Sequence, residues 1–388
     1  MRIALVSDTY TPQVNGVTTV VDRIAQLLPA AGHAVAVVAP AYPGPPPEPR
    51  GDELRIPSLP FPPYPSIRLA LPFARRVNSF LDRFAPDIVH VHTEGSLGTM
   101  GRRWALRHGR PLVTTFHTHF PQYARHYGVP RLEGLVWRWL TWFHRPARVT
   151  YTPGDTVQRE LIAKGLTQAR VWGRGVDTTR FHPSKRDQTW RERLRAGPDD
   201  VVVLHVGRLA PEKNLDVLIE SWRLGHRVLG PHVVWAIAGR GPLERRLAAE
   251  LPWVRRAGFL DRDDLAALYA SAEICMLPSQ TETCGLVALE AMASGLPVVA
   301  ADAGGLRESV EHEVSGLLVP PNDAHGFLSA VARLVIDREA RHDFSLAARA
   351  RAETRDQAPE DDELLADYAA LLPRDHILHS GVATCAVS

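Results

Sequence analysis

Two glutamates bracket a glycine in residues 278–300, which read PSQTETCGLVALEAMASGLPVVA. Glu282 lies on a loop after the apolar run 274–277, whereas Glu290 lies inside the helix that we expect to begin after Gly285. In a parallel α/β sheet, ligands bind at the carboxyl ends of the strands, where such a loop lies. The free N–H groups at the start of a helix suit a phosphate, and the two carboxylates suit the hydroxyl groups of sugars attached to it.

The simpler interpretation is that both carboxylates are solvated, as most glutamates are. The expected helix 286–294 argues against it, because this segment is apolar nearly all round, which is typical of a buried helix. A lone charge in a buried helix is costly unless it is hydrogen-bonded. We therefore interpret Glu282 and Glu290 as candidate ligand-binding residues.

Two cations form a second candidate group. Arg208 and Lys213 follow the strand expected at 201–207 and precede a helix. Arginine offers a planar fork to phosphate oxygens and lysine a compact charge, so the pair suits a diphosphate leaving group. Fixed cations stabilise the charge that grows on such a group as its bond breaks. The alternative is a pair of solvated surface residues, which the glutamate stretch makes less favoured.

The first half of the chain holds two further candidates. Gly16 lies at the entry to the first expected helix, where it either lets the backbone approach a ligand or forms an ordinary turn. No G-x-G-x-x-G motif occurs there, so the dinucleotide fingerprint is missing. His117 follows another expected strand, and we expect it to hydrogen-bond substrate. No third ligand is spaced to complete a zinc site with His117 and His119, so the sequence predicts no metal.

Composition bounds the class of protein. With 388 residues, 45% of them hydrophobic and 23% charged, the chain is typical of a globular protein with two domains. No apolar run approaches the ~20 residues of a membrane-spanning helix, and the first residues read as a strand rather than a signal peptide. The three cysteines lack metal spacing, and their odd number argues against a disulfide framework. We therefore expect the reducing cytoplasm.

Charge is distributed unevenly along the chain. Residues 1–180 hold 22 Lys and Arg against 12 Asp and Glu, so the first half is basic and the second acidic. Segments 66–84 and 131–148 mix arginines with aromatic and aliphatic side chains. Such a segment either lies on an anionic membrane or packs on a core with a solvated basic face, and the sequence leaves both open. No nucleic-acid-binding motif accompanies the charge.

Both halves alternate apolar runs with helical patterns, which predicts an α/β protein with doubly wound parallel sheets. The expected strands are 2–7, 34–39, 87–92, 111–116, 148–152 and 169–173, then 201–207, 233–239, 254–260, 274–278, 298–302 and 316–320. The proline-rich segments 43–49 and 57–65 are expected to be surface loops. A last helical pattern covers 361–372.

These motifs resemble those of the retaining glycosyltransferases of family 4, over roughly residues 1–372. The most specific is Glu282-x7-Glu290 leading into EAMASGLPV, followed by GR-x4-KN at 207–214 and GRGVDTTRF at 173–181. SDTYTPQVNGV at 7–17 and HTHFPQY at 117–123 are most similar to bacterial enzymes that build mannosylated or sulfoquinovosylated glycolipids.

The resemblance implies the GT-B architecture, in which two Rossmann-like domains with doubly wound parallel sheets face a cleft. We expect an acceptor-binding domain at 1–178 and a nucleotide-sugar-binding domain at 179–356. A C-terminal helix at 357–374 is expected to return to the first domain, and 375–388 to be a disordered tail.

The resemblance also implies a role for each candidate residue. Arg208 and Lys213 would hold the donor diphosphate, Glu282 the donor sugar and Glu290 the nucleotide ribose, while His117 would contact the sugar near the reacting carbon. The remaining donor-binding residues implied are Asn15, Gly16, Gly285, Leu286 and Val287. Cys284 stands where relatives often carry an aromatic residue, which puts the shape of the sugar pocket in question.

The expected reaction is the transfer of a hexose, with mannose from GDP-mannose favoured, to a hydroxyl group of a lipid or glycolipid. The anomeric configuration would be retained, the leaving phosphate would take the acceptor's proton, and neither cofactor nor metal is expected. The expected location is the cytoplasm at the inner face of the cell membrane, with the basic first domain contacting anionic lipid and no nucleic acid bound.

Three alternatives stay open at this point. One is a UDP-sugar-dependent glucosyl- or sulfoquinovosyl-type transferase. Another is a nucleotide-dependent oxidoreductase, which the missing glycine fingerprint disfavours. The third is a non-catalytic peripheral membrane protein that binds nucleotide sugars, which the intact cation pair and both glutamates disfavour.

Overall fold

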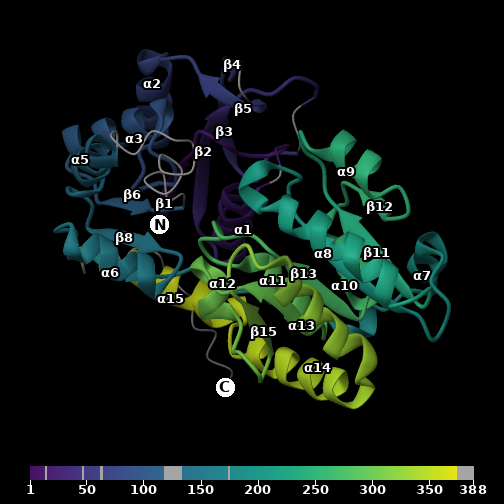
Figure 1. Ribbon diagram of the computed structural model, residues 1–388. Helices are drawn as coiled ribbons and strands as arrows, with labels where there is room; N and C mark the ends of the chain where they lie inside the picture. The colour runs from purple at the N-terminus through teal and green to yellow at the C-terminus, as the bar shows by residue number, and fades with distance from the viewer. Residues whose placement is uncertain (14, 46–47, 62–63, 118–132, 174, 374–388) are drawn as a thin grey trace, which may run out of the picture. The chain divides into compact units, whose positions relative to one another are not determined.

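The computed structural model describes residues 1–373 except 14, 46–47, 62–63, 118–132 and 174 (Figure 1). The tail expected at 375–388 lies outside the described residues. The chain divides into two compact units, unit 1 with Met1–Gly173 and Pro359–Ser388, and unit 2 with Arg174–Ala358. The chain passes from one unit to the other after Gly173 and after Ala358, a few residues from the domain boundaries expected from the sequence. The backbone of Val176 hydrogen-bonds that of Arg355 and Gln357, so Val176 belongs to unit 2.

Unit 1 is built on a seven-stranded parallel sheet in the order β3-β2-β1-β6-β7-β8-β9. Its strands are β1 (Arg2–Val6), β2 (Ala34–Pro40), β3 (Asp52–Ile56), β6 (Ile88–Val91), β7 (Leu112–Thr115), β8 (Val149–Thr152) and β9 (Ala169–Val171). The chain order reverses between β1 and β6. Ligands bind at such a reversal in open α/β sheets, at the carboxyl ends of the strands.

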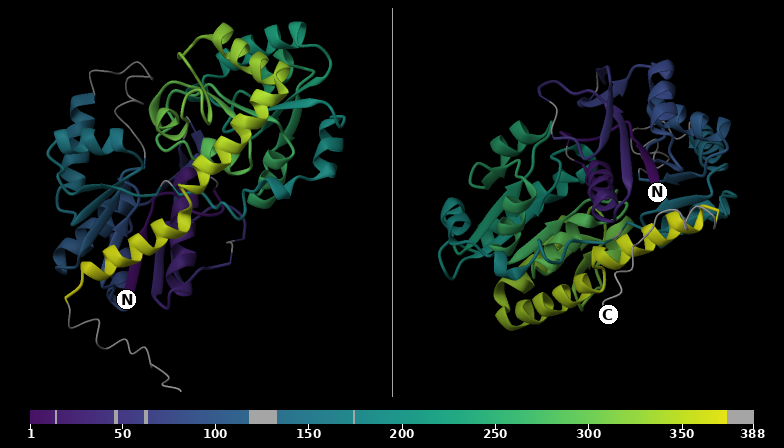
Figure 2. Two further views of the ribbon diagram at one scale, coloured as in Figure 1. Left: turned by 90° about the horizontal axis from the view of Figure 1, so that it is seen from below. Right: turned by 180° about the vertical axis from the view of Figure 1, so that it is seen from behind.

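Helices cover both faces of this sheet. They are α1 (Gly16–Ala30), α2 (Ala74–Phe84), α3 (Ser96–Arg107), α5 (Glu133–His144), α6 (Asp155–Ala163) and α15 (Gln357–Ala370). Because side chains alternate along a strand, Ile3 and Leu5 pack in one core with α1 and α15, whereas Ala4 and Val6 pack in another with α2 and α3. Figure 2 shows α15, in yellow, on the same side of unit 1 as α1.

The prediction of a surface loop at 57–65 is wrong. β4 (Ser58–Phe61) and β5 (Tyr64–Ala70) form a two-stranded antiparallel sheet, and Pro60 lies opposite Arg68 within it. Both strands of such a ribbon are edges, so a proline without an N–H group is tolerated there. The polar strand β3 was not predicted either, because a strand at the edge of a sheet has few buried side chains and so lacks a continuous apolar run.

Unit 2 contains a six-stranded parallel sheet in the order β12-β11-β10-β13-β14-β15, and its chain order reverses between β10 and β13. The strands are β10 (Val201–Val206), β11 (Val233–Ala238), β12 (Arg255–Gly258), β13 (Ile274–Leu277), β14 (Val298–Ala301) and β15 (Gly316–Val319). The helices are α7 (Gln188–Leu194), α8 (Leu215–Val228), α9 (Glu244–Glu250), α10 (Arg262–Ala270), α11 (Leu286–Ala293), α12 (Gly304–Ser309), α13 (Ala324–Ile336) and α14 (Arg338–Glu353). The predicted pair of doubly wound parallel sheets is confirmed.

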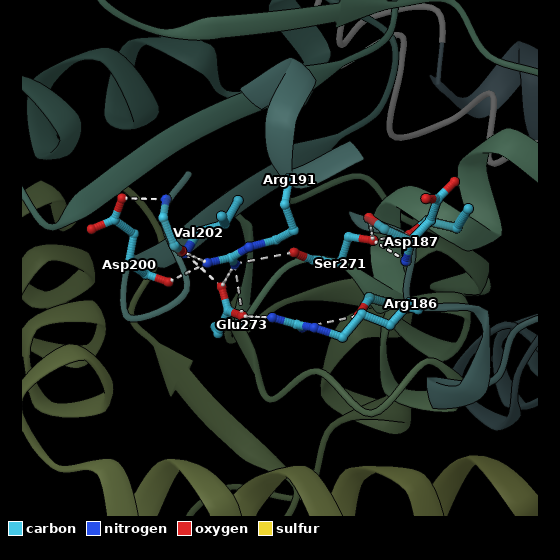
Figure 3. Close-up of polar contacts among 10 residues, drawn as sticks. Arg186, Asp187, Arg191, Asp200, Val202, Ser271 and Glu273 are labelled. Carbon is cyan, nitrogen blue, oxygen red and sulfur yellow. Dashed lines mark hydrogen bonds and ion pairs between the residues drawn. The ribbon is translucent and has the colours of Figure 1, made fainter. Parts of the chain in front are cut away.

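A buried ion pair fixes α7 to the sheet of unit 2. Figure 3 shows Arg191, whose side chain is 2% exposed, donating to both carboxylate oxygens of Glu273 at 2.8 and 3.0 Å. Glu273 also accepts from the N–H group of Val202 at 2.8 Å and from Arg186. Every charge in this group is hydrogen-bonded, which is the condition for a buried ion pair to be tolerated.

Within the described residues, the helices are too short or too polar to cross a bilayer.

Candidate functional site

The helix α11 begins at a tightly packed glycine in unit 2. Gly285 has a φ of 71°, in the left-handed region, and a Cβ there would lie 2.8 Å from Ser309 Oγ and 3.0 Å from the carbonyl oxygen of Gly305. The N–H group of Gly305 donates to the carbonyl of Glu282 at 2.6 Å, which holds the loop against α12. Among the described side chains none caps α11, so the N–H groups of Leu286 and Val287 lie at a helix start suited to an anion.

Lys213 and Glu282 form an ion pair at the carboxyl ends of neighbouring strands. Lys213 Nζ lies 2.5 Å from Glu282 Oε1, and the two side chains are 20% and 17% exposed. Lys213 ends the turn after β10, and Glu282 lies on the loop after β13. Burial tends to raise the pKa of Glu282, but the charge and hydrogen bond of Lys213, with help from Ser279, bring the pKa below its usual value. The carboxylate is therefore ionised and held in place.

A buried histidine, His205, lies near this pair and was not predicted. Its Nδ1 lies 2.9 Å from the carbonyl oxygen of Met276, which can only accept, so Nδ1 carries the proton. Burial lowers the pKa of His205 to about 4 and leaves the ring neutral. Its Nε2 is buried without a hydrogen-bond partner among the described residues. The only hint in the sequence is a histidine inside the apolar strand VVVLHV.

Arg208 lies on the same loop as Lys213 but pairs differently. One of its guanidinium nitrogens lies 3.8 Å from Glu212 Oε1, and its side chain is 39% exposed, whereas that of Glu212 is 6% exposed. The structure thus brings Lys213, Glu282 and His205 together and leaves Arg208 at the surface of the same loop.

Glu290 is buried within α11, as its apolar surroundings in the sequence predicted. Its Oε1 lies 3.5 Å from the guanidinium of Arg262. Burial raises the pKa of Glu290 to about 7, although the charges of Arg262 and Arg180 oppose this shift. A carboxyl group with this pKa is part-protonated near neutrality, so a ligand that donates hydrogen bonds would draw it toward the carboxylate form.

Asn15 and Gly16 lie at the start of α1 in unit 1. Asn15 Oδ1 accepts from the N–H group of Thr18 at 2.9 Å, and its Nδ2 donates to Thr9 Oγ1 at 3.0 Å. Asn15 therefore caps α1. A Cβ on Gly16 would meet nothing within 4 Å, so open space lies beside this backbone.

His117 follows β7 in unit 1 and is half-buried. Its Nε2 lies 3.2 Å from Nδ1 of His92, and the ring of His92 lies beside that of His90, with centroids 3.9 Å apart and planes tilted by 34°. Burial lowers the pKa of His117 to about 3 and that of His92 well below its usual value, so both rings are neutral.

The hydrogen-bond partners of His92 and His117 indicate which nitrogen of each ring carries the proton. His92 Nε2 is buried and has no hydrogen-bond partner in the described part of the chain. An orphaned buried N–H is rarer than an orphaned acceptor, which places the proton of His92 on Nδ1. His92 then donates to His117 Nε2, and His117 carries its own proton on Nδ1. His92 was not predicted either.

Within the ranges the structure describes, no three His, Cys, Asp or Glu side chains are grouped so that they could hold a metal ion.

Comparisons with known proteins agree with this architecture. The family model Glycosyltransferase Family 4 matches residues 14–180, and the model Glycosyl transferases group 1 matches residues 186–351. A GDP-mannose-dependent alpha-mannosyltransferase of Mycobacterium tuberculosis is 36% identical over 383 residues, covering 96% of this chain and 98% of the relative. A GDP-mannose-dependent alpha-(1-6)-phosphatidylinositol dimannoside mannosyltransferase of the same species is 31% identical over 366 residues, covering 91% of this chain and 92% of the relative.

A solved structure shows the same fold. Sucrose-phosphate synthase of Thermosynechococcus elongatus matches with a TM-score of 0.78 at 22% identity, over 95% of this chain and 98% of that one. The two doubly wound domains are those of GT-B glycosyltransferases. The chain belongs to family 4 of the glycosyltransferases and is a retaining enzyme, which excludes the oxidoreductase alternative.

Proposed function

We propose that the enzyme transfers mannose from GDP-mannose to a hydroxyl group of a lipid or glycolipid at the cytoplasmic face of the membrane. Relatives similar along almost their whole length carry GDP-mannose in their names, and the name of one also includes phosphatidylinositol dimannoside. The observation that carries the reaction is the Lys213–Glu282 pair beside the uncapped start of α11. It sets a cation and a carboxylate next to free helical N–H groups.

Each candidate residue of unit 2 then has a distinct role in the reaction. Lys213 and Arg208 hold the diphosphate, and the N–H groups of Leu286 and Val287 add neutral donors to the same anion. Glu282 accepts hydrogen bonds from hydroxyl groups of the transferred sugar. The cations stabilise the charge that develops as the sugar–phosphate bond breaks, and the leaving phosphate takes the acceptor's proton. No residue of the chain has to act as a covalent nucleophile in this scheme.

Further residues are proposed to contact the donor. Glu290 binds the hydroxyl groups of the nucleotide ribose. Gly16, with Asn15 capping the helix beside it, allows the donor phosphate to approach the backbone closely. His117 contacts the sugar through Nδ1–H, the atom that its bond with His92 leaves protonated.

A thermal-shift screen tests the donor. The full chain is melted with GDP-mannose, UDP-glucose and ADP-glucose at equal concentration, because a ligand that binds only the folded state raises the melting temperature. We expect the largest rise with GDP-mannose. A larger rise with UDP-glucose would contradict the proposed donor and favour the UDP-sugar-dependent alternative.

The variant Lys213→Ala tests the leaving-group role. We expect transfer to fall at least about 100-fold, because the charge developing on the diphosphate loses its fixed cation. Mannose transfer from labelled GDP-mannose to a lipid extract measures this, and circular dichroism verifies the fold. Lys185→Ala, which removes an exposed lysine elsewhere in unit 2, is the matched control. A fully active Lys213→Ala enzyme would show that the diphosphate is held elsewhere.

A further inference from the structure

A pocket of about 730 Å³ opens along one face of α5 in unit 1. Its lining from this helix follows the spacing of a single helical stripe and consists of Gly134, Trp137, Arg138, Thr141 and Trp142. Arg145 and Pro146, directly after the helix, also line the pocket. Across from the stripe, Arg102 of α3 and Lys164 at the end of α6 complete the lining. Figure 1 locates these three helices together in unit 1. None of the residues proposed for the transfer reaction lines this pocket.

The pocket combines aromatic walls with cations. Trp137 is buried, and Lys164 Nζ lies 5.2 Å from the centroid of its ring. The guanidinium of Arg102 lies 4.1 Å from the ring centroid of Trp142, which is 46% exposed. Both contacts have cation–π geometry, so each cation rests on an aromatic surface instead of on a carboxylate.

The charge of the pocket is not neutralised by its own lining. Among the residues that the structure describes, three arginines and one lysine line it, and no acidic residue does. Residues 101–150 hold nine arginines against a single acidic residue, Glu133. Arg102 is 8% exposed, and within the described part of the chain it donates to the carbonyl oxygens of Phe143 and Trp142, at 2.9 and 3.0 Å. Burial, with a smaller contribution from Arg103, lowers its pKa, as expected for a cation without a counter-charge.

Large apolar side chains of α5 are exposed to solvent on the surface beside the pocket. Leu135, Trp139 and Trp142 of α5 are 63%, 37% and 46% exposed. Tryptophan next to arginine is the combination that favours the boundary between lipid headgroups and acyl chains. A soluble anion would need the cations but not these exposed apolar side chains.

We propose that the α5 pocket binds the phosphate of an anionic membrane lipid, with Arg138 and Arg145 at the headgroup and the tryptophans at the level of the acyl chains. Arginine matches phosphate oxygens with two parallel N–H groups. The inference builds on the membrane contact in the proposed function and names the lipid group and the residues that make it. It does not depend on which sugar nucleotide is the donor.

Vesicle flotation tests this directly. The full-length protein is mixed with vesicles of phosphatidylcholine alone or with added phosphatidylglycerol, and the bound fraction is measured. We expect binding to require the anionic lipid. Arg138→Ala with Arg145→Ala should lower the partition coefficient about 25-fold, because each basic side chain near an anionic surface contributes about fivefold.

Two further variants separate the pocket from general surface charge. Gly134→Trp should weaken binding without any change of charge, because it adds a side chain at the pocket lining where a Cβ meets nothing within 4 Å. Arg159→Ala removes an exposed arginine of α6 outside the pocket and should weaken binding less than Arg138→Ala does. Equal losses for the two arginine variants, with no effect of Gly134→Trp, would overturn the proposal in favour of diffuse charge.

Three measurements test the source of the phosphate and the independence of the site. Tight, saturable binding of free glycerol 3-phosphate without vesicles, abolished by Gly134→Trp, would overturn the assignment to a lipid. Lys213→Ala should float with anionic vesicles as the parent protein does. The pocket variants should keep the thermal shift with GDP-mannose, so failure of the lipid site is distinguishable from failure of the proposed donor site.

Discussion

Glu290 places a carboxyl group in the apolar interior of unit 2, and this determines how it responds to pH. Its pKa is about 7 in the folded protein, against about 4.3 in an unfolded chain. Between these values the folded state holds a proton that the unfolded state has lost. The stability that this group contributes is therefore fully present below the unfolded pKa and is lost as pH rises through about 7.

The variant Glu290→Gln tests this linkage. It removes the titration, so the melting temperature of the parent protein should fall relative to that of the variant between pH 5 and pH 8. Parallel melting curves across this range would contradict the assignment. Affinity for GDP-mannose in the parent protein should rise over the same pH interval, because ribose hydroxyl groups need the carboxylate, and it should be weak in Glu290→Gln at every pH.

His92 offers a test of how His117 is positioned. His92→Phe removes the N–H group that donates to His117 Nε2, and we expect kcat to fall about tenfold or more, as for the loss of a buried hydrogen bond. His92→Asn presents an amide N–H in the place of Nδ1 and should restore much of the activity. KM for the donor should change little in either variant. Equal losses in both variants would point to a packing role only.

The sequence could predict the paired residues of the site but not the histidines behind them. Lys213 and Glu282 follow strands that the apolar pattern identifies, and parallel strands bring such loops to one edge of the sheet. His205 and His92 lie within apolar strands or at their ends. Whether their ring nitrogens are paired depends on the residues packed across from them, which no local pattern encodes.

At the scale of elements, two glycines at helix starts differ in their surroundings. Gly285 combines a positive φ with close neighbours, whereas Gly16 faces open space. Gly285→Ala should therefore destabilise unit 2 by about 1–3 kcal/mol and weaken donor binding. Gly16→Ala should melt like the parent protein but lose activity, because the new methyl group occupies the space proposed for the donor phosphate. Urea unfolding with a transfer assay measures both, and an active Gly16→Ala enzyme would contradict that placement.

Most strands were predicted to within a residue or two, because parallel strands buried on both faces are continuous apolar runs. The exceptions β3, β4 and β5 lie at the edge of the large sheet or outside it, where polar residues and prolines are tolerated. Edge pairing depends on the partner strand more than on the segment's own pattern, so this part of the fold could not be predicted from sequence alone.

At the scale of the whole molecule, α15 completes the core of unit 1 from the far end of the chain. Leu364 and Tyr368 are fully buried, and Tyr368 Oη lies 2.6 Å from His90 Nδ1. The carboxylate of Asp367 accepts from Tyr151 Oη at 2.7 Å, and the carbonyl of Glu360 accepts from Trp172 Nε1 at 2.8 Å.

Tyr368→Ala should cost unit 1 about 3–5 kcal/mol, the range for large buried aromatic residues. Hydrogen exchange followed by mass spectrometry measures this unit by unit. Strands β1, β6 and β8 should lose protection while those of unit 2 keep it. Leu346→Ala, at an exposed position of α14, is the control. Uniform loss of protection in both units would show that they unfold as one.

The division of unit 1 between the two ends of the chain also sets an order of events on the ribosome. Residues 1–173 are synthesised first, yet the helix that covers Leu5 and Ile24 is translated only after the whole of unit 2. Throughout that interval the nascent first domain exposes an apolar face that its own later sequence will cover. This face is where a chaperone would bind during translation, and a message truncated after codon 356 would leave it open permanently.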